Sequence, residues 1–206
     1  MRFISGSEYE IGDRSLENMV LDIGNLPNEL NGFTLLRESI LDNKTIAIHG
    51  FPGNTEENYT NIGRVTGYLR EFASPTAIPQ HKDASDIVAA TIVHLFKDDR
   101  CAKEWMTDMF VSQFEDSLGK EIGDGQRLVT VEKLEIDDFY EHSVGIRAVQ
   151  DGVEGVLSTT VIDFQMGNLL GVSFVVTVGD HGRTELATML GLELERSIVR
   201  ELLSTN

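Results

Sequence analysis

Residues 142–178, HSVGIRAVQDGVEGVLSTTVIDFQMGNLLGVSFVVTV, decide the fold, because apolar runs alternate here with short turn segments. The pattern predicts strands over 142–150, 155–165 and 168–178. Asp151-Gly152 and Met166-Gly167-Asn168 supply the tight-turn chemistry between them. Strands joined by such short turns run antiparallel, so this stretch predicts an antiparallel sheet.

Further strands are predicted on the N-terminal side of this stretch, over 33–41, 64–72, 86–97 and 126–136. The segment 86–97 is apolar on both faces. One face carries Val88, Ala90, Ile92 and Phe96, and the other carries Ile87, Ala89, Val93 and Leu95. A strand with this pattern is covered on both sides, so 86–97 is expected to be an inner strand.

Two long helices complete the pattern. The first begins at Asp98 and Asp99, which can cap and charge a helix N-terminus, and runs to about Leu118. Its predicted sheet-facing stripe is Cys101, Trp105, Met109, Phe114 and Leu118. The second spans 183–203 with Asp180 as its expected N-cap, and its stripe is Leu186, Leu190, Leu194, Ile198 and Leu202. Short helices are expected over 15–21 and after Asn54 or Thr55.

This order of elements predicts an α+β fold: an antiparallel sheet of about six to seven strands with two long helices packed on it. Residues 1–13 are polar and are expected to be a flexible lead-in. Residues 14–206 are expected to form a single domain, since no break in composition divides them.

The charge excludes whole classes of partner. The chain of 206 residues has 34 Asp and Glu against 17 Lys and Arg, a formal net charge of −17. Such a field repels phosphate, so nucleic acid and anionic lipid are not expected as partners. The acidity is explained by solubility or a salty habitat, or alternatively by a surface that attracts cations or a basic partner.

Familiar catalytic and cofactor motifs are absent from the sequence, which has no P-loop, dinucleotide-binding glycine pattern, zinc-protease helix, nucleophile elbow or EF-hand loop. The five histidines are scattered, so neither a metal site nor a cofactor is expected. The single cysteine, Cys101, permits no intrachain disulfide and is interpreted as a buried, inert thiol. It would be a nucleophile only if the fold brought a histidine beside it.

An acidic cluster, Asp137, Asp138, Glu141 and His142, could hold a cation or act as acid and base, but it is interpreted as a solvated loop between strands. No stretch reaches the roughly 20 apolar residues of a transmembrane segment. The first ten residues lack the apolar core of a signal peptide. The sequence is therefore that of a cytoplasmic protein, or of an exported one whose leader has been removed.

Three stretches resemble a group of uncharacterised exported, lipoprotein-like bacterial proteins. They are 16–41 with Asn25-Leu26-Pro27 and Gly32-Phe33, 63–68 with Gly63-Arg64 and Gly67-Tyr68, and 145–171 with Asp163-Phe164-Gln165-Met166-Gly167-Asn168. In the last of these Gln165 stands where that group usually has Arg. The order of strands and helices also resembles the PsbP/Mog1-like fold. The resemblance implies an extracytoplasmic location and a binding or accessory role, and it carries over no catalytic residue.

The sequence thus favours a non-enzymatic extracytoplasmic module that binds a small molecule or a protein partner. An apolar cleft between helix and sheet is the expected site, lined by Tyr68, His94, Trp105 and Phe164. His94 also fits as a satisfied core histidine. Two alternatives stay open: a hydrolase that uses Asp138 and His142, and an accessory subunit that docks through an acidic face.

Overall fold

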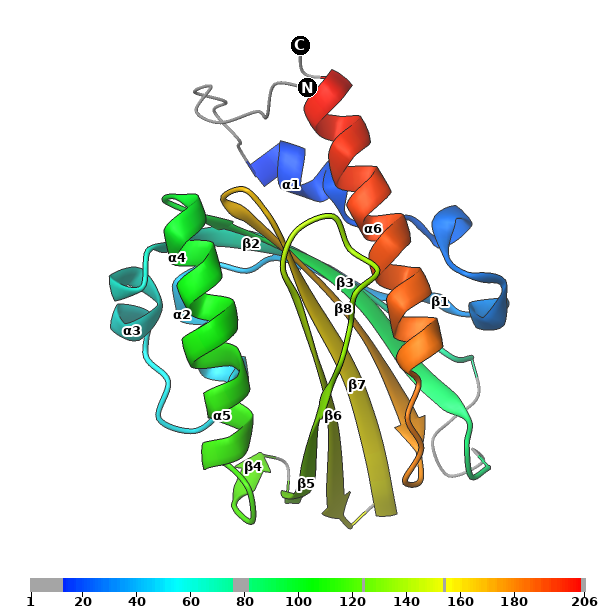
Figure 1. The fold of residues 1–206 in the computed structure, drawn as a ribbon. Helices are drawn as coiled ribbons and strands as arrows, with labels where there is room; N and C mark the ends of the chain where they lie inside the picture. Colours follow the sequence, from blue (N-terminus) through cyan, green and yellow to red (C-terminus); the bar gives the residue numbers. More distant parts are fainter. Residues whose placement is uncertain (1–12, 76–81, 124, 154, 205–206) are drawn as a thin grey trace.

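The computed structural model describes residues 13–75, 82–123, 125–153 and 155–204 (Figure 1). Eight strands form one curled antiparallel sheet, in the order β1-β2-β3-β8-β7-β6-β5-β4. Their bounds are β1 Thr34–Ile40, β2 Arg64–Ala73, β3 Asp86–Phe96, β4 Glu121–Gly123, β5 Gln126–Leu134, β6 Ser143–Gly152, β7 Gly155–Met166 and β8 Leu169–Val178.

The antiparallel pairing and the inner position of β3 are confirmed, because β3 pairs with β2 on one side and β8 on the other. The predicted strands agree with the observed ones to within two residues. The sheet has eight strands rather than six or seven, since β4 was not predicted. With three residues, β4 is too short to show an alternating pattern.

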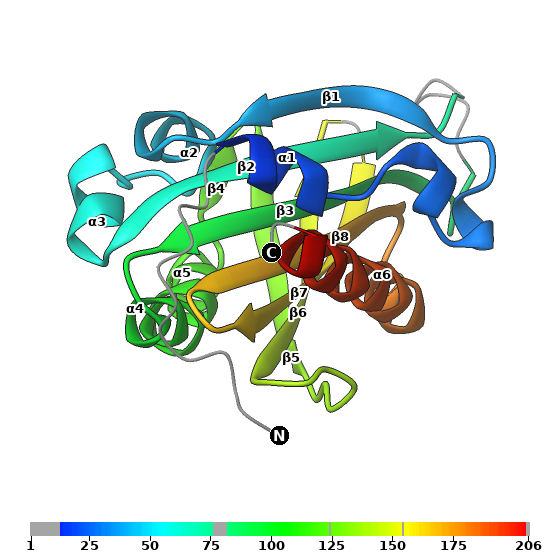
Figure 2. The same ribbon diagram turned by 90° about the horizontal axis from the view of Figure 1, so that it is seen from above.

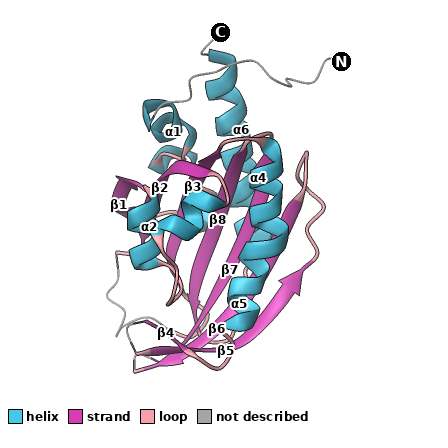
Figure 3. Cartoon of the chain, turned by 90° about the vertical axis from the view of Figure 1, so that its left-hand side faces the viewer, coloured by secondary structure: helices cyan, strands magenta, loops and turns pink. Residues whose placement is uncertain are grey.

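Helices cover both faces of the sheet. One face carries α1 (Asp13–Met19), the short 3₁₀ turns η1 (Ile23–Asn25) and η2 (Asn28–Leu30), and α6 (Thr184–Ser204). The other face carries α2 (Asn43–His49), α3 (Glu56–Asn61), α4 (Asp99–Glu104), the π-helical segment η4 (Trp105–Phe110) and α5 (Val111–Asp116). Figure 2 shows α4 and α5 on one side of strands β5–β7 and α6 on the other, and Figure 3 looks onto the α4–α5 side.

Each face has its own hydrophobic core, because alternate residues of a strand point to opposite faces. Ile162 and Phe164 of β7 pack under α6, whereas Val161 packs under α4. The stripe predicted for the last helix is confirmed: its first four members are buried and Leu202 is partly buried. An aromatic stack of Phe139 on Phe164, with ring centroids 4.6 Å apart, fills the α6 side.

The stripe predicted for the first long helix is wrong in its second half. Leu118 is exposed and Met109 is only partly buried, whereas Phe110 and Val111 are buried. The reason is the π-helical turn Trp105–Phe110, whose i→i+5 spacing brings Phe110 rather than Met109 below Trp105. A stripe read at the ordinary helical period misses this shift of one residue.

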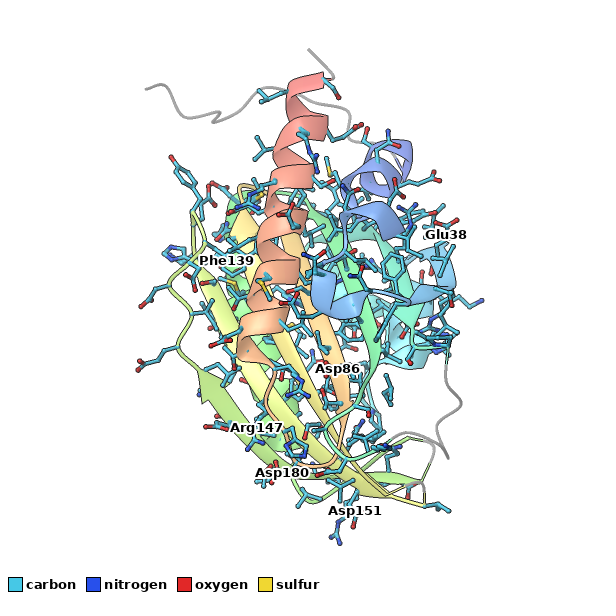
Figure 4. All side chains as sticks on the ribbon, turned by 90° about the vertical axis from the view of Figure 1, so that its right-hand side faces the viewer. Glu38, Asp86, Phe139, Arg147, Asp151 and Asp180 are labelled. Atoms are coloured by element: carbon cyan, nitrogen blue, oxygen red, sulfur yellow. The ribbon has the colours of Figure 1, made fainter. Side chains whose placement is uncertain are left out.

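The helix ends follow their local chemistry with one exception. Asp98 caps α4 by accepting a hydrogen bond from the backbone N–H of Cys101 at 2.8 Å, as predicted, and Thr55 caps α3. Asp180 is not the cap of α6, which begins at Thr184; its carboxylate instead forms an ion pair with Arg147. Figure 4 shows these two side chains close together below α6.

Two further N-terminal segments were not described correctly, or could not be tested, from the sequence. The helix α2, capped by Asp42, was not predicted, because residues 45–61 look like a loop rich in Gly, Asn and Glu. The lead-in expected for 1–13 lies, except for Asp13, outside the described residues. Within the described ranges, no helix combines the length and the apolar character that crossing a bilayer requires.

Candidate functional site

A layer of buried polar side chains lies between the sheet and the α3–α4–η4 side. We call Tyr59, Arg64, His94, Trp105 and Asp163 the buried polar cluster. Each is at least 90% buried, and all five come from different strands or helices. Polar groups at this depth normally have full sets of hydrogen bonds, so their partners decide what the cluster can do.

Arg64, at the start of β2, is 1% exposed and is held by neutral acceptors. Its guanidinium donates to Nδ1 of His94, to Oδ1 of Asn43 at 2.7 Å and to the Leu41 carbonyl at 2.7 Å. In the part of the chain that the structure describes, it forms no ion pair with a carboxylate. Burial lowers the pKa of Arg64 to about 10, so it keeps its proton at neutral pH.

His94, on β3, accepts from Arg64 through Nδ1, which fixes the ring orientation. Burial, followed by the neighbouring Arg64 charge, holds the pKa of His94 well below 6.5. The imidazole is therefore neutral at physiological pH and has its proton on Nε2. Its ring centroid lies 6.3 Å from that of Trp105.

Tyr59 connects the cluster to α5. Its hydroxyl accepts a hydrogen bond of 2.9 Å from the Asn54 amide, which also donates to Gln113 of α5. Burial raises the pKa of Tyr59, so its phenol stays protonated. Its ring packs on Trp105 with 5.5 Å between centroids.

Asp163, on β7, differs from Arg64 and His94 in the cluster because its carboxyl lacks hydrogen-bond partners. The residue is 1% exposed, and neither carboxyl oxygen has a hydrogen-bond partner. Burial raises the pKa of Asp163 well above 3.8, and the nearby Trp105 indole partly counters this shift. The Nε1–H of Trp105 faces the carboxyl but does not reach hydrogen-bond geometry, so it too is buried and unbonded.

The four side chains predicted to line the site divide between the two faces of the sheet. His94 and Trp105 lie together under the π-helical segment. Tyr68 and Phe164 belong to the core under α6, on the opposite face. A single cleft therefore does not contain all four.

Sequence reasoning missed Arg64 and Asp163 as site residues. The sequence did contain a signal: a charged residue lies on a strand at a position where the residues two places before or after it face the core. Asp163 follows Val161 on that face of β7, and both are buried. The contact of Asp163 with Trp105 depends on the tertiary fold. The sheet order β3-β8-β7 places β7 below the helix that carries Trp105, and the sequence alone does not give this order.

The other candidates do not form sites. Asp138 and His142 are exposed in the loop between β5 and β6, and no hydrogen bond joins them. Cys101 is buried on α4, and burial, then Asp98, raises the pKa of its thiol. Within the described residues, no three His, Cys, Asp or Glu side chains converge as metal ligands.

A surface groove between η2 and α6 is lined by Pro27, Asn28, Glu29, Met189, Leu192, Glu193 and Arg196.

Comparison with known proteins identifies the fold. No protein-family model matches the chain, and no curated protein matches it. Among solved structures, the extracellular domain of PknH from Mycobacterium tuberculosis is similar, with a TM-score of 0.63. The match covers 94% of this chain and 100% of that domain at 9% sequence identity. At this identity the likeness shows a shared architecture.

Proposed function

From this shared architecture and the buried polar cluster, we propose that the chain is a non-enzymatic extracytoplasmic binding domain. We place its ligand site below α4 and η4, at Asp163 and Trp105. The observation that carries the proposal is the Asp163 carboxyl, which is buried without a hydrogen bond to either oxygen. The finer fold assignment, a PsbP/Mog1-like domain, belongs to the same proposal.

An unpaired carboxyl is costly for a structural core. Leaving a buried polar group without a partner costs about 1–3 kcal/mol even for a neutral group. A leucine at this position would avoid this free-energy cost, because it has no polar atom to leave unpaired and its neighbour Val161 on the same face of β7 is also apolar. Groups that break the packing rules in an otherwise consistent core are expected at functional sites.

The helix above the carboxyl is suited to respond to a ligand. The π-helical turn Trp105–Phe110 begins at the residue that faces Asp163. Such turns are common at functional sites and interrupt the regular i→i−4 hydrogen bonding. A ligand that bonds Asp163 would therefore act directly on the least regular part of the α4–η4–α5 helix (Figure 3).

Two resemblances support the extracytoplasmic location. The solved structure that shares the fold is the extracellular domain of PknH. The motifs around Asn25, Gly63 and Asp163 resemble those of exported bacterial proteins. Neither resemblance assigns an enzymatic activity, and no hydrogen bond joins the exposed Asp138 and His142.

Native mass spectrometry of the protein purified from its own host tests the proposal. The wild-type chain is expected to carry a bound small molecule, and Asp163→Leu is expected to lose it. Far-ultraviolet circular dichroism establishes that the variant is folded. The same adduct in both proteins, or an adduct in neither, would contradict a ligand site at Asp163.

A further inference from the structure

We propose that the ligand of this site is a small organic ammonium ion whose N–H groups bond to the carboxylate of Asp163. This inference rests on the proposed function, because it names the class of molecule that the same site takes. It is carried by what the described residues place beside Asp163, which is the indole N–H donor of Trp105 and no basic side chain that pairs with the carboxyl.

The neighbours of Asp163 suit an ionised carboxylate that lacks its counter-ion. Among the described residues, the polar group that faces it is the Trp105 Nε1–H, a donor that favours the charged form. A protonated carboxyl would instead need an acceptor for its own hydrogen, and none bonds to either oxygen. An ammonium group supplies both the missing charge and the missing N–H donors.

The protein's own buried cation does not fill this role. Arg64 lies on β2, and strands β3 and β8 separate it from Asp163 on β7. Its donors are directed to His94, Asn43 and the Leu41 carbonyl. Among the residues that the structure describes, no basic side chain pairs with Asp163, so we infer that its counter-ion is a bound cation.

The surroundings favour an organic cation over a metal ion. A calcium or magnesium site needs several oxygen ligands, whereas Asp163 is the single carboxylate here and no three metal-binding side chains converge within the described residues. Tyr59 and Phe96 instead pack around Trp105, with centroids 5.5 Å and 6.0 Å from its ring. Asp163 therefore lies beside the indole of an aromatic group, and aromatic rings are typical surroundings for organic ammonium ions.

The whole molecule also favours this class. The net charge of −17 raises the local concentration of cations around the protein and speeds their encounter with it. The same field opposes the approach of anions. Since Asp163 is closed off from solvent, the cation reaches it through movement of the helix segment that carries Trp105.

Binding must be coupled to proton release. Burial raises the pKa of the Asp163 carboxyl, so below that pKa the free protein holds a proton there. Pairing with an ammonium ion ionises the carboxyl and releases this proton to solvent. The other titratable groups facing this layer do not change charge near neutral pH. His94 stays neutral, Arg64 stays charged, and the pKa values of Tyr59 and Cys101 are raised.

The test uses n-butylammonium chloride as the probe and n-butanol as its neutral counterpart. Trp105 is the only tryptophan, so its fluorescence reports on the site directly. The ammonium ion is expected to give a saturable change in the millimolar range or tighter, and butanol none. Calorimetry in two buffers of different ionisation enthalpy should show release of about one proton. Below the pKa of Asp163, the affinity for butylammonium should tighten about tenfold for each unit by which the pH is raised.

Two variants of equal net charge separate the site from general electrostatic attraction. Asp163→Asn should weaken butylammonium binding at least about thirtyfold and abolish proton release. Asp151→Asn removes an exposed carboxylate (Figure 4) and should leave both unchanged. Equal responses to butylammonium and butanol, binding without proton release, or no saturable response would overturn the inference. A neutral adduct in the native mass spectrum that depends on Asp163 would refute the ammonium class and leave the proposed binding function standing.

Discussion

Asp163 and Arg64 are the most deeply buried ionisable side chains on the α4 side of the sheet. Among the described residues, no ion pair joins them. Arg64 has its burial offset by three neutral acceptors. Asp163 has no such compensation and avoids the cost of a buried charge by keeping its proton. The two residues therefore behave differently when the pH changes.

The free energy of unfolding should contain a component from Asp163 that falls as the pH rises. The pKa of Asp163 is raised in the folded state, so the folded chain holds a proton that the unfolded chain releases near pH 4. This stabilisation is complete below the unfolded pKa and is lost as the pH approaches the folded pKa, at about 1.4 kcal/mol per pH unit.

Asp163→Asn isolates this component, because asparagine has nearly the same shape and does not titrate. In urea unfolding, the stability of the variant relative to the wild type should increase between about pH 4 and pH 7. The contribution of His94 is present in both proteins and cancels in the difference. A difference that is independent of pH would show that Asp163 is ionised in the folded protein.

Trp105 tests the packing of the same site. Its side chain is 6% exposed and contacts Tyr59, His94 and Phe96. Trp105→Ala should cost about 3–5 kcal/mol in urea unfolding, the usual range for removing a large core aromatic. Val153→Ala, at a side chain 96% exposed, is the control and should change stability little. A loss below about 1 kcal/mol for Trp105→Ala would mean that the indole is not packed in the core.

At the scale of elements, the close contact between β7 and β8 depends on a missing side chain. Gly171 of β8 lies opposite Phe164 of β7, and a Cβ atom at Gly171 would come within 2.2 Å of the Phe164 ring. That ring cannot move away easily, since it is fully buried and stacks on Phe139. The phenylalanine stack and the glycine thus form one unit of packing under α6.

Gly171→Ala should therefore destabilise the protein by about 1–3 kcal/mol, the usual cost of overpacking a core. Gly24→Ala is the matched control, because no atom lies within 4 Å of the position its Cβ would take. Thermal unfolding of the two variants gives the comparison. Equal melting temperatures would contradict the packing of Phe164 against β8.

At the scale of the whole molecule, acidic residues outnumber basic ones so far that pairing cannot neutralise them. Arg70 is shared between Asp22 and Glu38, and Arg147 between Glu132 and Asp180. Each of these arginines thus leaves one acidic charge uncompensated. The excess, 34 acidic against 17 basic residues, produces repulsion over the folded surface.

The melting temperature should therefore rise with sodium chloride. The screening length falls from about 30 Å at 0.01 M to about 10 Å at 0.1 M, so added salt weakens the repulsion between distant carboxylates. Differential scanning calorimetry across this range measures the effect. A flat or falling melting temperature would mean that local ion pairs, such as those of Arg70 and Arg147, outweigh the general repulsion.

The same charge predicts no measurable binding to duplex DNA at physiological salt, since affinity for phosphate depends on Lys and Arg contacts. Fluorescence anisotropy with a labelled duplex is a direct measurement. Saturable binding would show a basic patch formed by the fold and would remove nucleic acid from the excluded partners.

The sequence by itself determined the antiparallel sheet, the inner position of β3 and the stripe of α6. Each of these follows from local rules: two-residue periodicity, tight-turn residues at 151–152 and 166–168, and helical spacing from Leu186 to Leu202. The cap at Asp98 belongs to the same class, because its hydrogen-bond partner lies three residues away.

Only the tertiary structure decided the candidate site. The π-helical turn places Phe110 rather than Met109 in the core, and a one-residue change of helical period leaves no clear signal in the pattern. Which strand lies below Trp105 depends on the order β3-β8-β7, which is set by packing between segments far apart in the chain. Asp163 and Trp105 are 58 positions apart, so no local rule relates them; they meet because two cores must be filled on opposite faces of one sheet.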